Sequence, residues 1–213
     1  MFFRFCCVAA ISYLLGSVNF SIIVSRWLIG ADIRNYGSKN AGMTNSFRVM
    51  GGKKTLIVIL GDVSKGALSV LIAYLIFRET GGSLLIYAKL TAAVFAVAGH
   101  IFPIYFGFKG GKGVLTTASV LLFFDWRILL ALLVVFAVSY FPLFYVSLSS
   151  VLAAFSLPFL LYFFYRDLPV TAIGIIMSGG IIFMHRSNIV RLINGTEVKT
   201  NFFKRTEREA SKK

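Results

Sequence analysis

Long apolar stretches without charge constrain the fold of this 213-residue protein more than any other feature. They fall at residues 5–25, 55–77, 84–106, 113–124, 128–147, 149–165 and 169–184. A helix needs about 20 apolar residues to cross the hydrocarbon core of a bilayer. The sequence therefore predicts an all-α polytopic membrane protein with about seven transmembrane helices, built as a single domain over residues 1–213.

Two of these stretches do not have the length of one transmembrane helix. The stretch 113–124 spans only about 18 Å as a helix, so we expect it to begin earlier, within a glycine run, or to lie where the protein thins the bilayer. Residues 128–165 contain no charge over 38 positions, which favours two helices with a bend near Ser147–Ser150. A count of five crossings is left open.

The formal net charge of +14 indicates a sidedness. Lys and Arg gather in segments 26–54 and 107–112 and in the tail from Arg186, whereas the other turns are short and nearly neutral. Because positively charged loops stay in the cytoplasm, we predict an outside N-terminus and a cytoplasmic C-terminus, with 200–213 as a projecting charged tail. In a sequence this apolar, the positive charge is explained by topology and anionic lipid, so nucleic acid is not an expected partner.

The first polar block follows the first apolar stretch and is rich in glycine and hydrogen-bond donors. Glycine allows turns in which successive N–H groups converge on an anion, and an arginine can bind a phosphate through two hydrogen bonds. The block therefore predicts a phosphate site, although an ordinary polar loop is an open alternative. Its candidate residues are Gly37, Ser38, Asn40, Gly42, Thr44, Asn45 and Arg48.

The second polar block opens the short fourth stretch. Three glycines and two lysines before a helix N-terminus would combine free N–H groups, a positive dipole end and point charges. The candidates for phosphate binding are Lys109, Gly110, Gly111 and Lys112, with Gly113 next in the sequence. The spacing differs from a P-loop, and a flexible basic turn against lipid headgroups is the alternative.

The third polar block lies where the last apolar stretch ends. His185, Asn188 and Arg191 are spaced by three residues, so they share a helix face. A histidine leaving a membrane helix beside polar neighbours is a candidate proton acceptor or phosphate donor. The alternative is an interfacial cap with solvated charges. Ser150 or its neighbour Ser149, at the expected bend, is a further candidate.

Smaller features complete the set of candidate positions. Asp62 and Lys65 are three residues apart inside the second apolar stretch, where ionisable side chains face the bundle or a cavity; a packing ion pair and a substrate-binding role are both open. Ser17, after Gly16, suits close helix packing. Neither a hydrolase Gly-x-Ser-x-Gly elbow nor a metal-ligand spacing occurs, so we expect no metal and no cofactor.

Taken together, the three blocks resemble the PlsY family of bacterial acyl-phosphate–glycerol-3-phosphate acyltransferases over nearly the whole sequence. The resemblance rests on the three blocks in order, with Asp62-x-x-Lys65-Gly66 and Gly99-His100 between them. It continues to Glu197 and Lys199 after the third block. Lys39 stands where glycine is usual in the family, which adds a positive charge beside the first block.

The resemblance implies a reaction and its location. A fatty acyl phosphate would donate its acyl group to the 1-hydroxyl of sn-glycerol 3-phosphate, giving lysophosphatidic acid and phosphate, on the cytoplasmic side of the bacterial inner membrane. We assign Gly37, Ser38, Asn40, Gly42 and Thr44 to the donor phosphate, and Arg48, Lys112, His185 and Asn188 to glycerol 3-phosphate. Direct attack without an acyl-enzyme is favoured, with His185 or a substrate phosphate as the base. Docking of the enzyme that makes acyl phosphate is left open.

Two other functions remain as alternatives at this level. A transporter for a phosphorylated solute would place its charges near the bilayer midplane, often in two related halves, whereas here they gather at one face. A non-catalytic scaffold would spread anionic lipid binding over many charges. Single changes at Asn40 or His185 would then have little effect on function.

Overall fold

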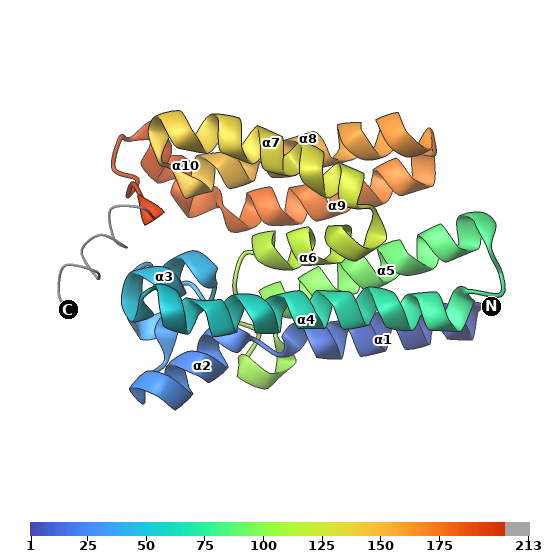
Figure 1. Ribbon diagram of the computed structural model, residues 1–213, viewed down its shortest axis with the longest axis horizontal. Coiled ribbons are helices and arrows are strands. Elements are labelled where there is room, and N and C mark those ends of the chain that lie inside the picture. The colour runs from blue at the N-terminus through green and yellow to red at the C-terminus, as the bar shows by residue number, and fades with distance from the viewer. Residues whose placement is uncertain (203–213) are drawn as a thin grey trace.

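The computed structural model describes residues 1–202, and these residues form ten α-helices and two short 3-10 helices (Figure 1). The α-helices are α1 (Phe2–Ser17), α2 (Phe20–Ile29), α3 (Met43–Met50), α4 (Gly52–Phe77), α5 (Gly82–Ile101), α6 (Val114–Phe124), α7 (Trp126–Leu143), α8 (Val146–Tyr165), α9 (Leu168–Met184) and α10 (Arg186–Ile193). The 3-10 helices are η1 (Ile33–Asn35) and η2 (Ile104–Phe106). The prediction of an all-α membrane protein is confirmed.

The predicted apolar stretches are helical in the structure, but the first, 5–25, is broken at Val18–Asn19 into α1 and α2. The side chain of Asn19 accepts a hydrogen bond from the Ile22 N–H and caps α2 there. Five spans are long and apolar enough to cross a membrane: Phe2–Ile29, Gly52–Phe77, Gly82–Phe106, Trp126–Leu143 and Val146–Tyr165. Helices α9 and α10 join at a bend of 59° and count as a sixth span when taken together. Helix α6 has only 11 residues. The number of crossings and the direction of the termini therefore stay predictions.

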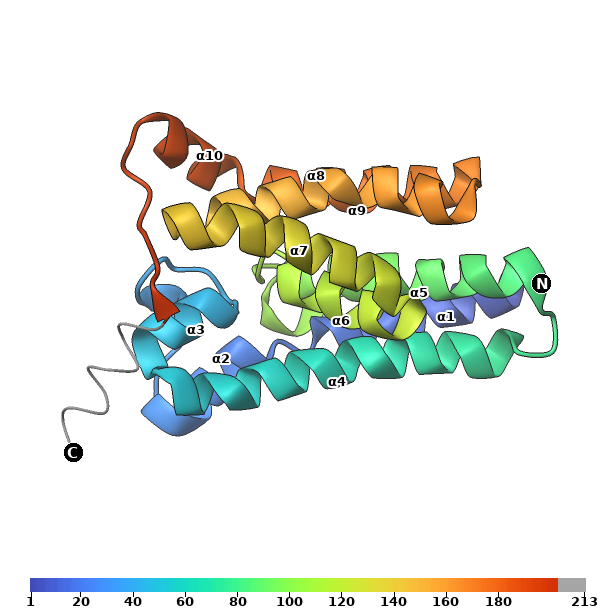
Figure 2. The same cartoon turned by 45° about the horizontal axis from the view of Figure 1, so that its top comes forward.

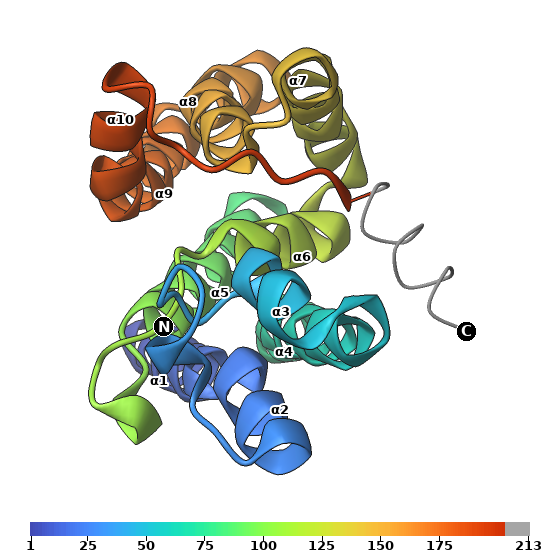
Figure 3. The same cartoon turned by 90° about the vertical axis from the view of Figure 1, so that its left-hand side faces the viewer.

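The helices form two groups, α1–α6 and α7–α10, which lie side by side and pack against each other (Figures 2 and 3). An apolar core joins them through side chains such as Leu90, Val120, Leu132 and Leu157, all buried. The outer faces of α4, α7 and α8 carry exposed large apolar side chains. A soluble protein would bury such continuous faces, so this surface suits a lipid environment.

Helices α1 and α5 approach each other closely through small residues. A Cβ at Gly16 would overlap the backbone of Ala96, and a Cβ at Gly99 would overlap the backbone of Tyr13. Ser17 is buried and donates a hydrogen bond to the carbonyl of Tyr13 at 2.8 Å. The predicted packing role of Gly16 and Ser17 is confirmed, because close helix contact in lipid depends on small side chains.

The bend between α7 and α8 lies earlier than predicted. It falls at Phe144, which has a φ of 58°, whereas Ser147–Ser150 lie within α8. The hydroxyls of Ser149 and Ser150 donate to the carbonyls of Tyr145 and Val146, at 3.1 and 2.8 Å. Serines can satisfy their hydroxyls in this way inside a helix, so these residues do not break it.

One of the two expectations for the short fourth stretch was that its helix begins earlier, within the glycine run. This expectation is wrong. Helix α6 begins at Val114, nearer the middle of the molecule than the start of α4 (Figure 1). Helix α3, the bend before α10 and the last described residues all lie toward one end of the molecule. The N-terminus of the short helix α6 therefore faces a region that other polar segments surround.

Candidate active site

A cavity of about 490 Å³ lies between α3, the N-terminus of α6, α8 and α10. It brings together residues from all three polar blocks of the sequence. The predicted site residues that line it are Ser38, Asn40, Gly42, Thr44, Asn45, Arg48, Lys112, Ser150, His185, Asn188 and Arg191. Gly37, Lys109, Gly110 and Gly111 were predicted with them but are not part of its wall.

Three helices begin at the wall of this cavity. Helix α3 follows Gly42, α6 follows Gly113 and α10 follows His185, and none of these N-termini is capped by a hydrogen bond to a side chain. The first N–H groups of a helix have no partner within the helix, and they carry the positive end of its dipole. Three such ends around one cavity make it suited to bind anions.

Asn45 organises the first block rather than presenting its amide to the cavity. Its Oδ1 accepts a hydrogen bond from the Ser38 N–H at 2.8 Å. Its Nδ2 donates to the carbonyls of Tyr36 and Asn40, at 3.0 Å each. Because both ends of this amide are occupied within the loop, its predicted role as a substrate donor is replaced by a structural one. Gly37 contributes through its φ of 58°, and a Cβ at this position would overlap Asn45 Oδ1.

The second block contributes less to the cavity than predicted. The N–H groups of Gly110 and Gly111 already donate to the carbonyls of Ile101 and His100, at 3.1 Å each. These amides therefore do not form the predicted phosphate cradle. Lys109 lines a separate surface pocket beside Asp32, so of this block only Lys112 and Gly113 line the cavity.

Lys112, Asn188 and Glu197 form a connected series of hydrogen bonds. The Lys112 ammonium donates to Asn188 Oδ1, and Asn188 Nδ2 donates to Glu197 Oε1 at 2.6 Å. Glu197 also accepts from Ser147 at 2.7 Å and from Arg191 at 2.7 Å. The carboxylate therefore fixes the amide orientation, so that the Asn188 oxygen faces the ammonium.

The charges in this series depend on burial and on their partners. Burial lowers the pKa of Lys112 to about 8, although the nearby Glu197 opposes this shift. Burial alone would raise the pKa of Glu197, but hydrogen bonds from Asn188, Ser147 and Arg191 hold that pKa below its usual value. At neutral pH the cavity therefore contains an ammonium and an ionised carboxylate.

His185 is buried, with an exposed fraction of 3%, at the bend between α9 and α10. Its Nδ1 lies 2.8 Å from the carbonyl oxygen of Ile181. A carbonyl oxygen can only accept, so Nδ1 carries the proton. In a neutral imidazole this leaves Nε2 as an acceptor. Nε2 can therefore accept a hydrogen bond from a group bound in the cavity.

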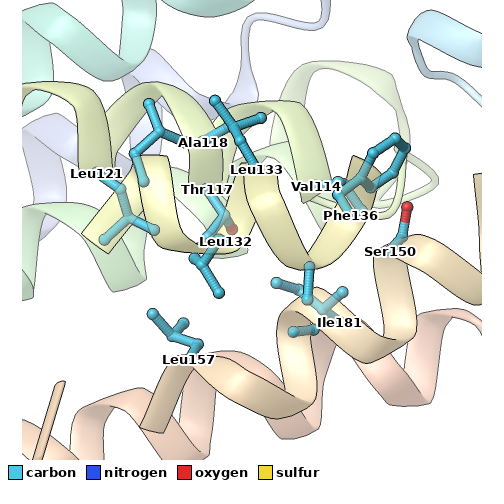
Figure 4. Close-up of a pocket in the computed structure, with 13 residues that line it drawn as sticks. Val114, Thr117, Ala118, Leu121, Leu132, Leu133, Phe136, Ser150, Leu157 and Ile181 are labelled. Atoms are coloured by element: carbon cyan, nitrogen blue, oxygen red, sulfur yellow. The ribbon is translucent and has the colours of Figure 1, made fainter. Parts of the chain in front are cut away.

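An apolar groove of about 70 Å³ adjoins the polar cavity (Figure 4). Side chains from α6, α7 and α8 line it, among them Leu121, Leu132 and Leu157. The residues that belong to the walls of both spaces are Val114, Ala118, Leu133, Phe136 and Ser150. The site therefore joins an anion-binding cavity to a surface that suits a hydrocarbon tail.

The comparisons with known proteins agree with this combination. A family model described as glycerol-3-phosphate acyltransferase matches residues 6–195. The chain belongs to this family. A glycerol-3-phosphate acyltransferase of Geobacillus kaustophilus is 39% identical over 195 residues, which cover 92% of this chain and 95% of the relative. That of Bacillus subtilis is 38% identical over 192 residues, which cover 90% and 95%.

Solved structures of the same family have the same fold. The crystal structure of PlsY, an integral membrane glycerol 3-phosphate acyltransferase, in its glycerol 3-phosphate form, has a TM-score of 0.82 and 34% identity to this chain. The match covers 94% of this chain and 97% of PlsY. A lysophosphatidic acid form of PlsY matches with a TM-score of 0.80 and 31% identity. The PlsY resemblance inferred from the sequence is confirmed.

Three buried side chains, Asp62, Lys65 and His100, form a cluster at the cavity of this family member. Lys65 Nζ lies 2.8 Å from Asp62 Oδ1, 2.8 Å from His100 Nδ1 and 3.1 Å from the carbonyl oxygen of Val18. Asp62 and His100 also line the cavity. The predicted ion pair exists, and His100, which was not predicted to take part, joins it. The lysine thereby connects α4 to α5 and to the break between α1 and α2.

Several residues that build this acyltransferase site are not evident from the sequence pattern. Glu197 lies in the quoted family pattern, but its acid charge gave no reason to place it among anion ligands. Ser147 follows the α7–α8 break and carries no charge. Thr200 lies in a segment predicted to project away, yet it is buried and bonded to Arg48. The remaining positions of the predicted tail, 203–213, lie outside the described residues.

Proposed function

We propose that the protein transfers a fatty acyl group from an acyl phosphate to the 1-hydroxyl of sn-glycerol 3-phosphate. The products would be 1-acyl-sn-glycerol 3-phosphate and inorganic phosphate, and the step would begin phospholipid synthesis. The observation that supports this most is the shared wall between the anion cavity and the apolar groove. Both substrates carry a phosphate, which the polar cavity can bind. The donor also carries a long acyl group, so its binding site must include an apolar surface next to that cavity.

The residues can be divided between the two phosphates. We assign Ser38, Asn40 and Thr44, with the N–H groups that open α3, to the phosphate of the donor. We assign Arg48, Lys112, His185 and Asn188 to glycerol 3-phosphate. Each group lines the cavity, so the binding energy would hold two anions together and oriented, which accounts for much of the rate in such a transfer.

The transfer requires no covalent enzyme intermediate. The 1-hydroxyl oxygen would attack the acyl carbon, the bond from that carbon to the phosphate oxygen would break, and phosphate would leave with the electron pair. The hydroxyl proton would pass to His185 Nε2 or to a substrate phosphate. An acyl phosphate is a mixed anhydride with a good leaving group, so positioning and charge neutralisation are the main tasks of the protein.

The proposal includes a location and partners. The protein is an integral membrane protein, and we place it in the bacterial inner membrane with the cavity on the cytoplasmic side. This placement follows from the basic loops and from glycerol 3-phosphate being a soluble substrate. Docking of the enzyme that makes acyl phosphate would shorten the path of the donor, and it remains an expectation.

The donor is tested directly with purified protein in lipid or detergent. The protein receives labelled sn-glycerol 3-phosphate with either palmitoyl phosphate or palmitoyl-CoA. We expect labelled lysophosphatidic acid from palmitoyl phosphate alone. Product from palmitoyl-CoA alone would overturn the donor assignment. No product from either donor, in a folded sample, would favour the transporter alternative, which a flux assay in proteoliposomes would then examine.

The mechanism is tested at Ser38 and His185. Mass spectrometry of protein quenched during turnover should find no acyl group on Ser38, because direct attack needs no nucleophilic serine. A trapped acyl-Ser38 would refute direct attack. For His185→Ala, a loss of about 100-fold or more in kcat would identify the histidine as the base. A variant that keeps most of its kcat would assign the proton to a substrate phosphate.

A further inference from the structure

The segment after α10 crosses the cavity end of the molecule and joins its two helix groups. Residues 196–202, here called the strap, run from α10 to the side of α3 and α7 (Figures 2 and 3). The family model ends at residue 195, so the strap lies beyond the residues that this model matches, although Glu197 and Lys199 belong to the family pattern described above. Its described residues nevertheless contact side chains of the candidate active site.

Thr200 is held through its own backbone. Its N–H donates to the carbonyl of Phe144 at 2.9 Å, and its carbonyl accepts from the Tyr140 hydroxyl at 2.8 Å. Phe202 adds ring contacts to Phe47, with centroids 4.8 Å apart. The backbone of the strap is therefore fixed to α7, and its end packs against α3.

This fixed backbone directs the Thr200 hydroxyl toward Arg48. The Arg48 guanidinium donates through Nη2 to Thr200 Oγ1, and it lies 3.4 Å from the carbonyl oxygen of Val198. A guanidinium has five N–H donors in a fixed plane. Contacts at Nη2 therefore fix the direction in which the whole guanidinium points.

The Thr200 hydroxyl is an uncharged partner of Arg48, and this matters for anion binding. Glu197 is close enough to interact electrostatically with Arg48. If Arg48 paired directly with that carboxylate, its charge would be neutralised and Glu197 would be drawn from Asn188. The Thr200 hydroxyl orients the guanidinium through a hydrogen bond and adds no negative charge to it.

We propose that Thr200 is a positioning residue that holds the Arg48 guanidinium ready for the phosphate of sn-glycerol 3-phosphate. This inference rests on the proposed function, because it assigns a step to the same cavity. It adds to the site Thr200, which lies beyond the residues that the family model matches. The strap thereby sets the affinity for the soluble substrate without contacting the reacting atoms.

The test compares Thr200→Val with Thr200→Ser in steady-state kinetics. For Thr200→Val we expect KM for sn-glycerol 3-phosphate to rise about tenfold or more, the scale of a hydrogen bond to a charged group. KM for palmitoyl phosphate should change less than about twofold. Thr200→Ser keeps the hydroxyl and should restore the wild-type value. If Thr200→Val does not fold, Thr200→Cys retains the volume with a much weaker acceptor.

The matched control is Thr196→Val, at an exposed position of the same strap. It should leave both KM values unchanged. The inference is overturned if Thr200→Val leaves KM for sn-glycerol 3-phosphate unchanged, or if Thr200→Ser fails to restore it. Equal rises in both KM values with a lowered Tm would also overturn it, by indicating a structural role only. Titration of the variants with sn-glycerol 3-phosphate alone should show the same loss of affinity, so the inference can be judged even if the proposed donor is wrong.

Discussion

Lys112→Met should reduce kcat/KM for sn-glycerol 3-phosphate by about 100- to 1,000-fold. Lys112 places an ammonium in the cavity beside Asn188, at the N-terminus of α6. A charge fixed in advance where a reacting anion binds contributes about this much to the rate of an enzyme. Methionine keeps the length of the side chain, so the measured loss reports the charge. Steady-state kinetics with palmitoyl phosphate gives the result.

The same lysine should make the reaction dependent on pH. Its pKa is lowered to about 8 by burial, and only the protonated form attracts a phosphate. The value of kcat/KM, which reports groups of the free enzyme, should therefore fall as pH rises through about 8. In Lys112→Arg the guanidinium stays charged over this range. The alkaline decline should then disappear, even if the activity at neutral pH is lower.

Lys109→Met is the matched control for this prediction. Lys109 is three residues away in the same glycine-rich block, but it lines a separate surface pocket. Its replacement should change kcat/KM less than about threefold, the scale of an exposed charge. Equal losses in Lys109→Met and Lys112→Met would contradict the view that the cavity position matters. An alkaline decline that persists in Lys112→Arg would assign the titration to another group.

The membrane fold could be predicted from hydropathy, since a bilayer requires continuous apolar helices. The two helices of 128–165 were predicted in this way. Their bend was predicted near Ser147–Ser150, from the length of the uncharged run, whereas it falls at Phe144, which adopts the left-handed conformation. The predicted direction of the termini is set by how the positively charged loops are placed across a membrane. The arrangement of the helices alone does not test it.

The candidate site could be predicted only in part, for a different reason. Residue types and spacing identify groups that suit phosphate, such as Ser38, Lys112 and His185, which line one cavity. They do not identify the partners that each group already has. The amides of Gly110 and Gly111 are occupied by carbonyls of the preceding turn. Thr200 gave no signal, because its contact with Arg48 joins positions 152 residues apart.

Lys65→Met should cost about 3–5 kcal/mol of folding free energy, the largest stability effect that we predict. The Lys65 and Asp62 side chains are 2% and 0% exposed, and their charged atoms lie 2.8 Å apart. Removal of the cation leaves a buried carboxylate without its counter-charge, which costs about this much. Thermal or denaturant unfolding in detergent measures the loss.

The double variant Asp62→Asn/Lys65→Met separates the ion pair from the volume of its side chains. It removes both charges, so it should regain most of the stability lost in Lys65→Met. Lys89→Met on α5 is the control, because that ammonium lies 5.5 Å from the centre of the Tyr74 ring; its replacement should cost about 0.5–1 kcal/mol. A double variant less stable than Lys65→Met would mean that neutralising Asp62 is not the main role of Lys65. Its contacts with His100 and Val18, which join α4 to α5 and to the α1–α2 break, would then be the main source of stability. If the double variant is more stable, the charge pair is the reason that this lysine lies between those helices.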